Sequence, residues 1–153
     1  MQLDRADHVI LDAMQRNART GLEALAADSG LSVASVQRRV RRLRDAGVIL
    51  GEVALLDPAK VGQPMGFVVM VELERERLDQ IDAFTRRVQA EPQVQQCYYV
   101  TGEADFCLIC MARDMEDFQA LTHRLFFENA NVRRFRTSVM MDRKKTGLAV
   151  PIP

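Results

Sequence analysis

The stretch "SVASVQRRVRRLRDAGVI", residues 32–49, concentrates five arginines between Arg38 and Arg44. The whole chain carries 21 basic and 21 acidic side chains, so its formal net charge is zero. On a helical wheel of about 100° per residue, the arginines lie opposite or beside an apolar edge that must be buried. This edge is formed by Val33, Val36, Val40 and Leu43. Because Asp45 is the only acid in the segment, the cationic face repels itself and favours a polyanionic partner.

The residues before this segment predict two shorter helices, which gives a winged-type helix-turn-helix of three helices over residues 1–50. In "TGLE", Thr20 precedes Glu23 by three residues, a capping-box pattern that predicts the start of a helix through "LEALAADS". Gly30 ends that helix, Ser32 caps the next and Gly47 closes it. The first helix is indicated by apolar residues at helical spacing, namely Leu3, Ala6, Ile10, Leu11 and Met14.

This motif predicts contact with double-stranded DNA. Residues near the start of the third helix are small or able to form hydrogen bonds and could approach base edges, whereas the later arginines are better placed for phosphates. The alternative is a solvated charged face, but such faces usually interleave acids with bases. The predicted DNA-contacting residues are Ser32, Ala34, Ser35, Gln37, Arg38, Arg39, Arg41 and Arg42.

Beyond Gly47 the pattern becomes strand-like. "VILGEVALL" and "DPAKVGQP" predict a linking strand and hinge, placed at residues 51–64. Residues 65–142 then alternate in the order β-α-β-β-α-β, which predicts a ferredoxin-like domain. The two helices in it are marked by Leu78, Ile81, Phe84 and Val88, and by Met115, Phe118, Leu121 and Leu125. The predicted fold class is therefore α+β, with residues 143–153 as a peripheral C-terminal tail.

Several classes of protein are excluded by composition. The first fifteen residues lack the apolar core of a signal peptide, and runs such as "GFVVMV" are too short to span a membrane. Three cysteines, an odd number, favour a reducing cytoplasm over a disulfide framework. Cys107 and Cys110 would face opposite sides of a strand, and His8 and His123 lie on separate helices, so we predict no metal, no cofactor and no catalytic set. We expect a cytoplasmic protein that is not an enzyme.

Three segments together resemble one protein family over essentially the whole chain. "LDRADHVILDAMQRNAR", "LSVASVQRRVRRLRDAGVI" and "VTGEADFCL" are similar to the opening helix, recognition helix and signature turn of the Lrp/AsnC, or feast/famine, transcriptional regulators. The resemblance implies dimers formed through the C-terminal domain, which commonly assemble into octameric rings. It also implies that small amino acids bind in clefts between dimers and alter assembly or DNA affinity.

The resemblance also implies a set of effector-binding residues. Gly102 would leave backbone amides open to a carboxylate, Asp105 would accept from an ammonium group, and methionines could line an adaptable apolar pocket. Glu103 stands where the family often has aspartate, and Ala104 where it commonly has a larger residue, and both bear on which ligand fits. The implied set is Tyr98, Tyr99, Val100, Thr101, Gly102, Glu103, Ala104, Asp105, Met115, Ser138, Val139 and Met140.

We therefore expect a sequence-specific DNA-binding regulator whose affinity or assembly responds to an amino-acid effector. The alternative is a nucleoid-type architectural protein that binds DNA without a ligand and with little sequence preference. Selection from random DNA would separate the two.

Overall fold

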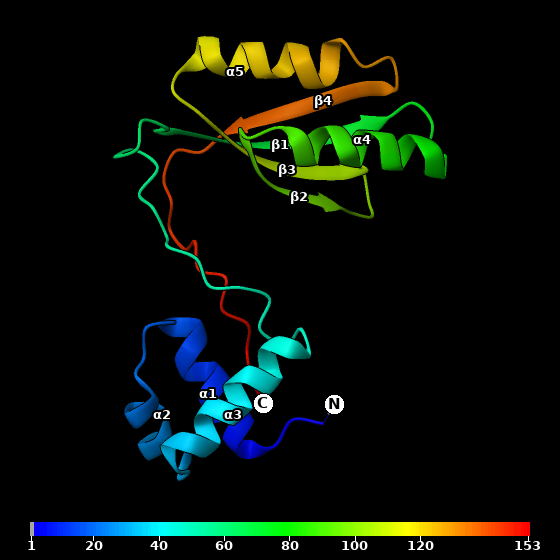
Figure 1. Ribbon diagram of the computed structural model, residues 1–153. Helices are drawn as coiled ribbons and strands as arrows, with labels where there is room; N and C mark the ends of the chain where they lie inside the picture. The colour runs from blue at the N-terminus through cyan, green and yellow to red at the C-terminus, as the bar shows by residue number, and fades with distance from the viewer. Residues whose placement is uncertain (1) are drawn as a thin grey trace. The chain divides into compact units, whose positions relative to one another are not determined.

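The structure, a computed structural model, describes residues 2–153 and divides the chain into two compact units. One unit consists of the residues up to Leu55 together with Lys145–Pro153, and the other of Leu56–Lys144. The first is a bundle of three helices, and the second is a four-stranded sheet with helices packed on it (Figure 1). Each unit has its own cluster of buried apolar residues.

The helical unit contains α1 (Arg5–Arg16), α2 (Leu22–Ser29) and α3 (Val33–Asp45), which confirms the three predicted helices. The predicted inward edge of α3 is buried at three of its four positions. Val33 is the exception, with 42% of its surface exposed, because it is the first residue of α3 and extends past the bundle. The core of this unit is Ile10, Leu25, Ala26, Val36, Val40 and Leu43.

The helix ends follow the predicted signals in all but one place. Gly30 and Gly47 have φ angles of 70° and 69°, a conformation that glycine adopts without steric cost. The predicted capping box at Thr20 and Glu23 is wrong, because the N-cap of α2 is Gly21 and the Thr20 hydroxyl donates instead to the carbonyl oxygen of Asn17 at 2.7 Å. The capping box lies at the start of α1, where two aspartates three residues apart exchange backbone-to-carboxylate hydrogen bonds.

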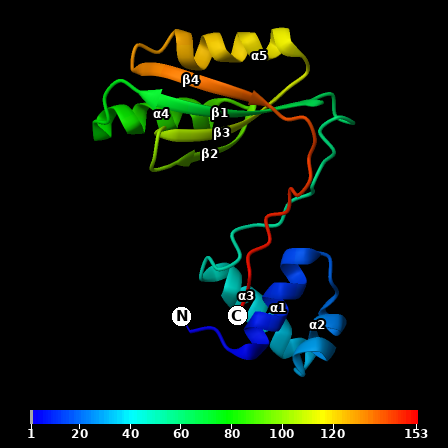
Figure 2. The same cartoon turned by 180° about the vertical axis from the view of Figure 1, so that it is seen from behind.

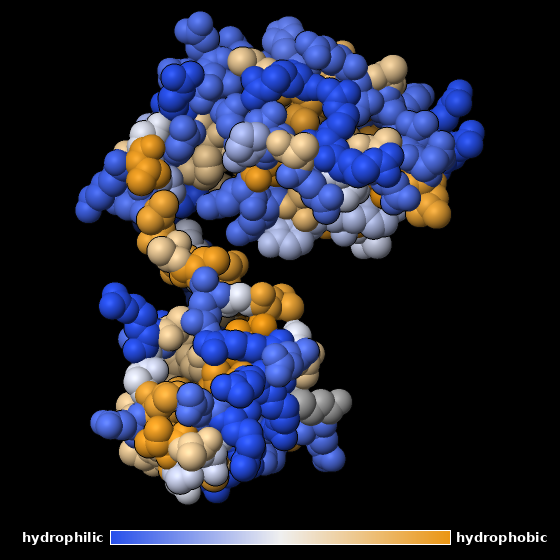
Figure 3. All heavy atoms as spheres, viewed as in Figure 1, coloured by the Kyte–Doolittle hydropathy of each residue, from blue (hydrophilic) through white to orange (hydrophobic). Residues whose placement is uncertain are grey.

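Two segments differ from the expectations for the connections. The predicted linking strand is not formed, because residues 51–64 pair with no other strand among the described residues. A strand needs a neighbouring strand to accept and donate its backbone hydrogen bonds. Apolar side chains along it are largely exposed, with Val53 at 77% and Leu55 at 81% (Figure 3). The C-terminal tail, in contrast, is not peripheral, because Lys145–Pro153 belongs to the helical unit.

The second unit has the predicted β-α-β-β-α-β order. Its elements are β1 (Met65–Leu73), α4 (Leu78–Ala90), β2 (Val94–Tyr99), β3 (Phe106–Ala112), α5 (Met115–Thr122), a π-helical turn η1 (His123–Phe127) and β4 (Val132–Val139). The sheet is antiparallel with strand order β2-β3-β1-β4, which is the ferredoxin-like arrangement. Figure 2 shows the same sheet from behind.

Both helices of this unit pack on one face of the sheet. The alternation along β1 buries Phe67, Val69 and Val71 completely, as a strand with one covered face requires. The Phe67 ring stacks on Phe118 of α5 with centroids 3.8 Å apart, and the Phe84 ring of α4 lies 4.8 Å from a phenylalanine ring of β3. Among the described residues of this unit, no helix packs on the opposite face of the sheet.

Candidate nucleic-acid interface and effector site

The third helix presents a polar face away from the core of its unit. Ser32 caps it, with Oγ accepting from the Ser35 backbone N–H at 3.2 Å, and so leaves the first turn ordered. Ala34, Gln37, Arg38 and Arg41 are exposed, while Ser35 is half-buried. The structure therefore brings the predicted base-contacting residues onto one solvent-facing side of α3.

Two of the five arginines are turned toward α1 instead. Arg39 Nη1 lies 2.7 Å from Asp4 Oδ2 and 2.9 Å from Asp7 Oδ1. Arg42 Nη2 lies 2.7 Å from Asp7 Oδ2, so the carboxylate of Asp7 bridges both guanidinium groups. The predicted self-repulsion of α3 is thus partly relieved by acids that precede and begin α1.

The electrostatics of this bridge follow from burial and pairing. Burial alone would raise the pKa of Asp7, but the backbone N–H of Asp4, the Arg39 guanidinium and the charge of Arg42 outweigh it and lower the pKa below its usual value. The pKa of Asp4 is lowered chiefly by the Asp7 backbone N–H and then by Arg39. Asp7 is completely buried, so its charge depends on these partners.

The ion pairs of Asp7 distinguish two groups among the arginines of α3. Among the residues that the structure describes, Arg38 and Arg41 make no ion pair, whereas Arg44 pairs with Glu52 beyond the helix. Sequence reasoning missed Asp4 and Asp7, although the Asp-x-x-Asp pattern before an apolar run is itself a capping signal. Arg38 and Arg41 are therefore exposed arginines of α3 that have no ion-pair partner among the described residues.

In the second unit, the predicted effector turn joins β2 to β3. Gly102 has a φ of 115°, which is unfavourable for a residue with a side chain. The turn is closed by the Val100 N–H donating to the Asp105 carbonyl oxygen at 2.8 Å. Tyr98 and Tyr99 are about half exposed beside it, at 51% and 58%. The tip of the turn, Thr101 to Glu103, is exposed, and Ala104 is half-buried.

Asp105 differs from the free acceptor that the sequence predicts. Only 8% of its surface is exposed, and its Oδ2 accepts from the backbone N–H of Leu73 at 2.7 Å. The side chain therefore ties the end of β1 to the turn. A hydrogen bond to this carboxylate, together with its charge, raises the pKa of Glu76 above the usual value. Two acids thus stand close together at this end of the sheet.

The twelve predicted effector residues do not converge within one chain. Val71 of β1 pairs with Phe106, next to the turn, whereas Phe67 of β1 pairs with Val139. At roughly 3.4 Å per residue, four strand positions separate the two sets by about 14 Å. Ser138, Val139 and Met140 lie near the start of β1, and α5 begins with Met115 at the same end of the sheet. The residues of the turn lie near the end of β1, at the opposite end of the sheet.

Methionine side chains gather at the end of the sheet where β1 begins. The Met140 N–H donates to the Gly66 carbonyl oxygen at 2.8 Å, and its thioether covers Gly66 so closely that a Cβ there would lie 2.5 Å from the sulfur. Met115 is 45% exposed at the start of α5, and Met141 is 94% exposed. These flexible side chains form an adaptable apolar surface.

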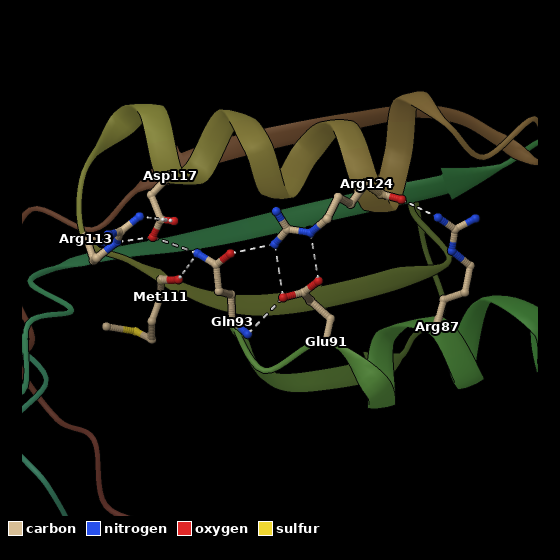
Figure 4. Close-up of polar contacts among 7 residues, drawn as sticks. All are labelled: Arg87, Glu91, Gln93, Met111, Arg113, Asp117 and Arg124. Atoms are coloured by element: carbon tan, nitrogen blue, oxygen red, sulfur yellow. Dashed lines mark hydrogen bonds and ion pairs between the residues drawn. The ribbon is translucent and has the colours of Figure 1, made fainter.

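A polar network holds the helices α4 and α5 at this unit's edge (Figure 4). Arg124 of η1 donates to Glu91 Oε2 at 3.2 Å and to Gln93 Oε1 at 2.7 Å. The Gln93 amide in turn donates to Asp117 Oδ2 at 3.0 Å, and Asp117 pairs with Arg113. The guanidinium of Arg87 in α4 donates to the carbonyl oxygen of Arg124 in η1. These contacts join α4, the turn before β2, the end of β3, α5 and η1 within one unit, so we interpret the network as structural.

The described residues contain neither a metal-binding cluster nor a membrane-spanning helix. No group of three or more His, Cys, Asp or Glu side chains in residues 2–153 could hold a metal ion. Within that range, no helix is both long and apolar enough to cross a bilayer. Burial raises the pKa of the Cys97 thiol to about 11 and that of Cys110 to about 12, so neither thiol is a nucleophile near neutral pH.

Two families match this combination of units. Residues 3–49 match the winged helix-turn-helix DNA-binding family, and residues 66–150 match the Lrp/AsnC ligand binding domain. The chain belongs to the Lrp/AsnC family. This Lrp/AsnC protein is thus a DNA-binding transcriptional regulator with a ligand-binding domain, as the three sequence segments predicted.

Relatives of known name are similar to this chain over most of its length. An uncharacterized HTH-type transcriptional regulator, y4tD, of Sinorhizobium fredii is 48% identical over 152 residues, covering 99% of this chain and 90% of the relative. The leucine-responsive regulatory protein of Haemophilus influenzae is 33% identical and covers 94% of this chain and 86% of its own length. These relatives are named regulators, in line with the predicted absence of an enzyme.

Solved structures of similar proteins include complexes with an amino acid. A transcriptional regulator of Neisseria meningitidis in complex with L-Met has a TM-score of 0.90 at 28% identity, covering 98% of this chain and 97% of that one. A feast or famine regulatory protein of M. tuberculosis complexed with L-methionine has a TM-score of 0.89 at 30% identity, covering 99% and 100%.

Proposed function

We propose that this Lrp/AsnC regulator contacts DNA through the Arg38 and Arg41 side of α3 and that a small amino acid, bound between copies of the ligand-binding unit, modulates its DNA affinity. The observation that carries the first half is the contrast among the arginines. Arg39 and Arg42 are held by buried or half-exposed aspartates of the same unit, while Arg38 and Arg41 are exposed and make no ion pair among the described residues.

The DNA interface is tested by salt dependence. Each phosphate neutralised by a cation adds about 0.9 to the slope of log affinity against log salt concentration. Arg41→Ala should weaken binding to every sequence and flatten the slope by about one, whereas Arg42→Ala should flatten it less and destabilise the helical unit instead. A slope that Arg42→Ala changes as much as Arg41→Ala would contradict the proposed division. Selection from random DNA would reveal an architectural protein by a lack of sequence preference.

The proposed dimer rests on the uncovered face of the sheet. Val68, Met70 and Ile109 are only half-buried there, because no helix of this unit covers them within the described residues. A stable protein interface buries roughly 800 Å² on each partner, which a face of four strands can supply. The exposed apolar residues of the segment after α3 offer further area. Light scattering coupled to gel filtration should give a multiple of the 17.3 kDa chain mass, and a monomer at micromolar concentration would refute the dimer.

The proposed effector site rests on the separation of its two halves. Since the turn and the Met140 end lie at opposite ends of β1 in one chain, a ligand touching both needs two copies of the unit. L-methionine is the first candidate, because similar structures hold it and because Met115 and Met140 form an apolar surface here.

A thermal-shift scan of the purified protein against all twenty amino acids tests the site. A ligand at a hundred times its dissociation constant adds roughly 2.7 kcal/mol, which raises the unfolding midpoint by several degrees. We expect a rise with L-methionine or a similar apolar amino acid. No rise with any amino acid would refute amino-acid sensing and leave DNA binding intact.

A further inference from the structure

The last nine residues of the chain lie against α1 of the helical unit. Figures 1 and 2 both show the C-terminus at the three-helix bundle. The side-chain amide of Gln15 forms two hydrogen bonds with a single tail residue: its Nε2 donates to the Val150 carbonyl oxygen at 2.9 Å, and its Oε1 accepts from the Val150 N–H at 2.9 Å. One glutamine thus satisfies both backbone groups of Val150, as a neighbouring strand would.

The sequence of the tail suits this docking. The segment ends "AVPIP", so Pro151 follows Val150 and Pro153 follows Ile152. A residue before proline is biased toward extended backbone, which is the conformation that presents an N–H and a carbonyl to the same side chain. Prolines also reduce the conformational entropy that the tail loses on docking. Ile152 is half-buried, whereas most of residues 141–151 are exposed.

The docked tail leaves the DNA-contacting face of α3 free. The groove between the tail and the bundle is lined by His8, Val9, Asp12 and Arg16 of α1 and by Asp28 of α2. None of the exposed residues of α3 lines it. The side of α1 that faces α3 carries Asp7 and Ile10 instead. The tail therefore lies on the side of the bundle formed by α1 and α2, and it does not cover the exposed face of α3.

The tail begins where the second half of the proposed effector site lies. β4 ends at Val139, and Met140 is anchored on Gly66 by its backbone N–H. Only residues 141–149 separate that anchor from the residue held by Gln15. The helical unit is thus connected to the sheet twice, once through the segment after α3 and once through the tail. A change at the end of β4 reaches α1 along a short covalent path.

We propose that Gln15 is a docking residue for the chain's own C-terminal tail, and that the docked tail couples the β4 end of the ligand-binding unit to the DNA-binding unit. The docking stands on the Gln15–Val150 contacts alone, and the coupling rests on the proposed function. Two hydrogen bonds and one half-buried isoleucine stabilise the docked state only modestly, so a ligand that moves β4 has enough energy to release it.

Hydrogen exchange of the full-length protein tests the docking. A net hydrogen-bond stabilisation of roughly 0.5–1.5 kcal/mol corresponds to about a 2- to 13-fold slowing of exchange at the Val150 amide. Gln15→Ala should remove this protection, and Gln119→Ala, which changes an exposed glutamine of α5, should keep it. Val150→Pro deletes the donor and should loosen the tail in the same way. Equal exchange in the wild type and Gln15→Ala would overturn the docking, and protection lost on dilution to monomers would assign the tail to a second copy.

DNA affinity measured with and without L-methionine tests the coupling. Gln15→Ala and a chain that stops after Gly147 should both bind DNA and L-methionine, but the ratio of the two DNA affinities should fall toward one. A ratio unchanged in both variants would overturn the coupling. If wild-type DNA affinity does not respond to L-methionine at all, the proposed effector fails, while the exchange experiment still decides the docking.

Discussion

Replacing Asp7 with asparagine removes the charge that holds Arg39 and Arg42 without changing the size of the side chain. Asp7 is completely buried and accepts hydrogen bonds from Arg39 Nη1 at 2.9 Å and from Arg42 Nη2 at 2.7 Å. Removing one partner of a fully buried ion pair costs about 3–5 kcal/mol. Here the guanidinium groups retain water, with 23% and 46% of the two side chains exposed, and asparagine keeps one acceptor. We therefore expect a loss of about 2 kcal/mol.

For a unit of this size, each kcal/mol shifts the midpoint by about 4–8 °C, so Asp7→Asn should lower it by about 8–16 °C. The same change releases Arg42, whereas Arg39 keeps its ion pair with Asp4, so the salt dependence of DNA binding should steepen by about one. Circular dichroism on heating and binding titrations at several salt concentrations measure the two effects. Asp28→Asn is the matched control, because it removes the same charge from an exposed position of α2 and should change stability by less than about 0.5 kcal/mol.

The two readouts can fail separately. A loss below about 0.5 kcal/mol for Asp7→Asn would mean that the bridge is not formed in solution. A loss of stability with an unchanged salt slope would mean that Asp7 does not withhold Arg42 from DNA.

Three further outcomes are expected. The lowered pKa of Asp7 contributes stability that is present above its unfolded pKa of about 3.9 and is lost as the pH falls below it, so the midpoint of the helical unit should drop between about pH 5 and pH 3, and less so in Asp7→Asn. Gly66→Ala should cost about 1 kcal/mol and alter the amino-acid response, because the new Cβ displaces the flexible Met140 side chain; an unchanged unfolding curve would argue against that contact. Cys97 and Cys110, with pKa values raised to about 11 and about 12, should resist thiol reagents at pH 8 until the protein unfolds, and rapid labelling of either would contradict their burial.

The sequence by itself determined the elements and their order. The periodicity of α3, the glycines that end helices and the alternation along β1 are local signals, because they depend on side chains a few residues apart. The three N-terminal helices and the β-α-β-β-α-β order followed from them. The predicted capping box at Thr20 was wrong, because its hydroxyl donates to the backbone carbonyl of Asn17 and does not cap α2.

Only the tertiary structure decided which charged groups are available. Arg39 and Arg41 are indistinguishable by residue type, yet one is held by acids more than thirty residues earlier and the other is exposed. The register of β1 with β3 and β4 likewise separated the two halves of the predicted effector set, which a linear list could not reveal. The return of the tail to Gln15 joins positions 135 residues apart. Contacts of this kind depend on long-range packing, which no local pattern along the chain records.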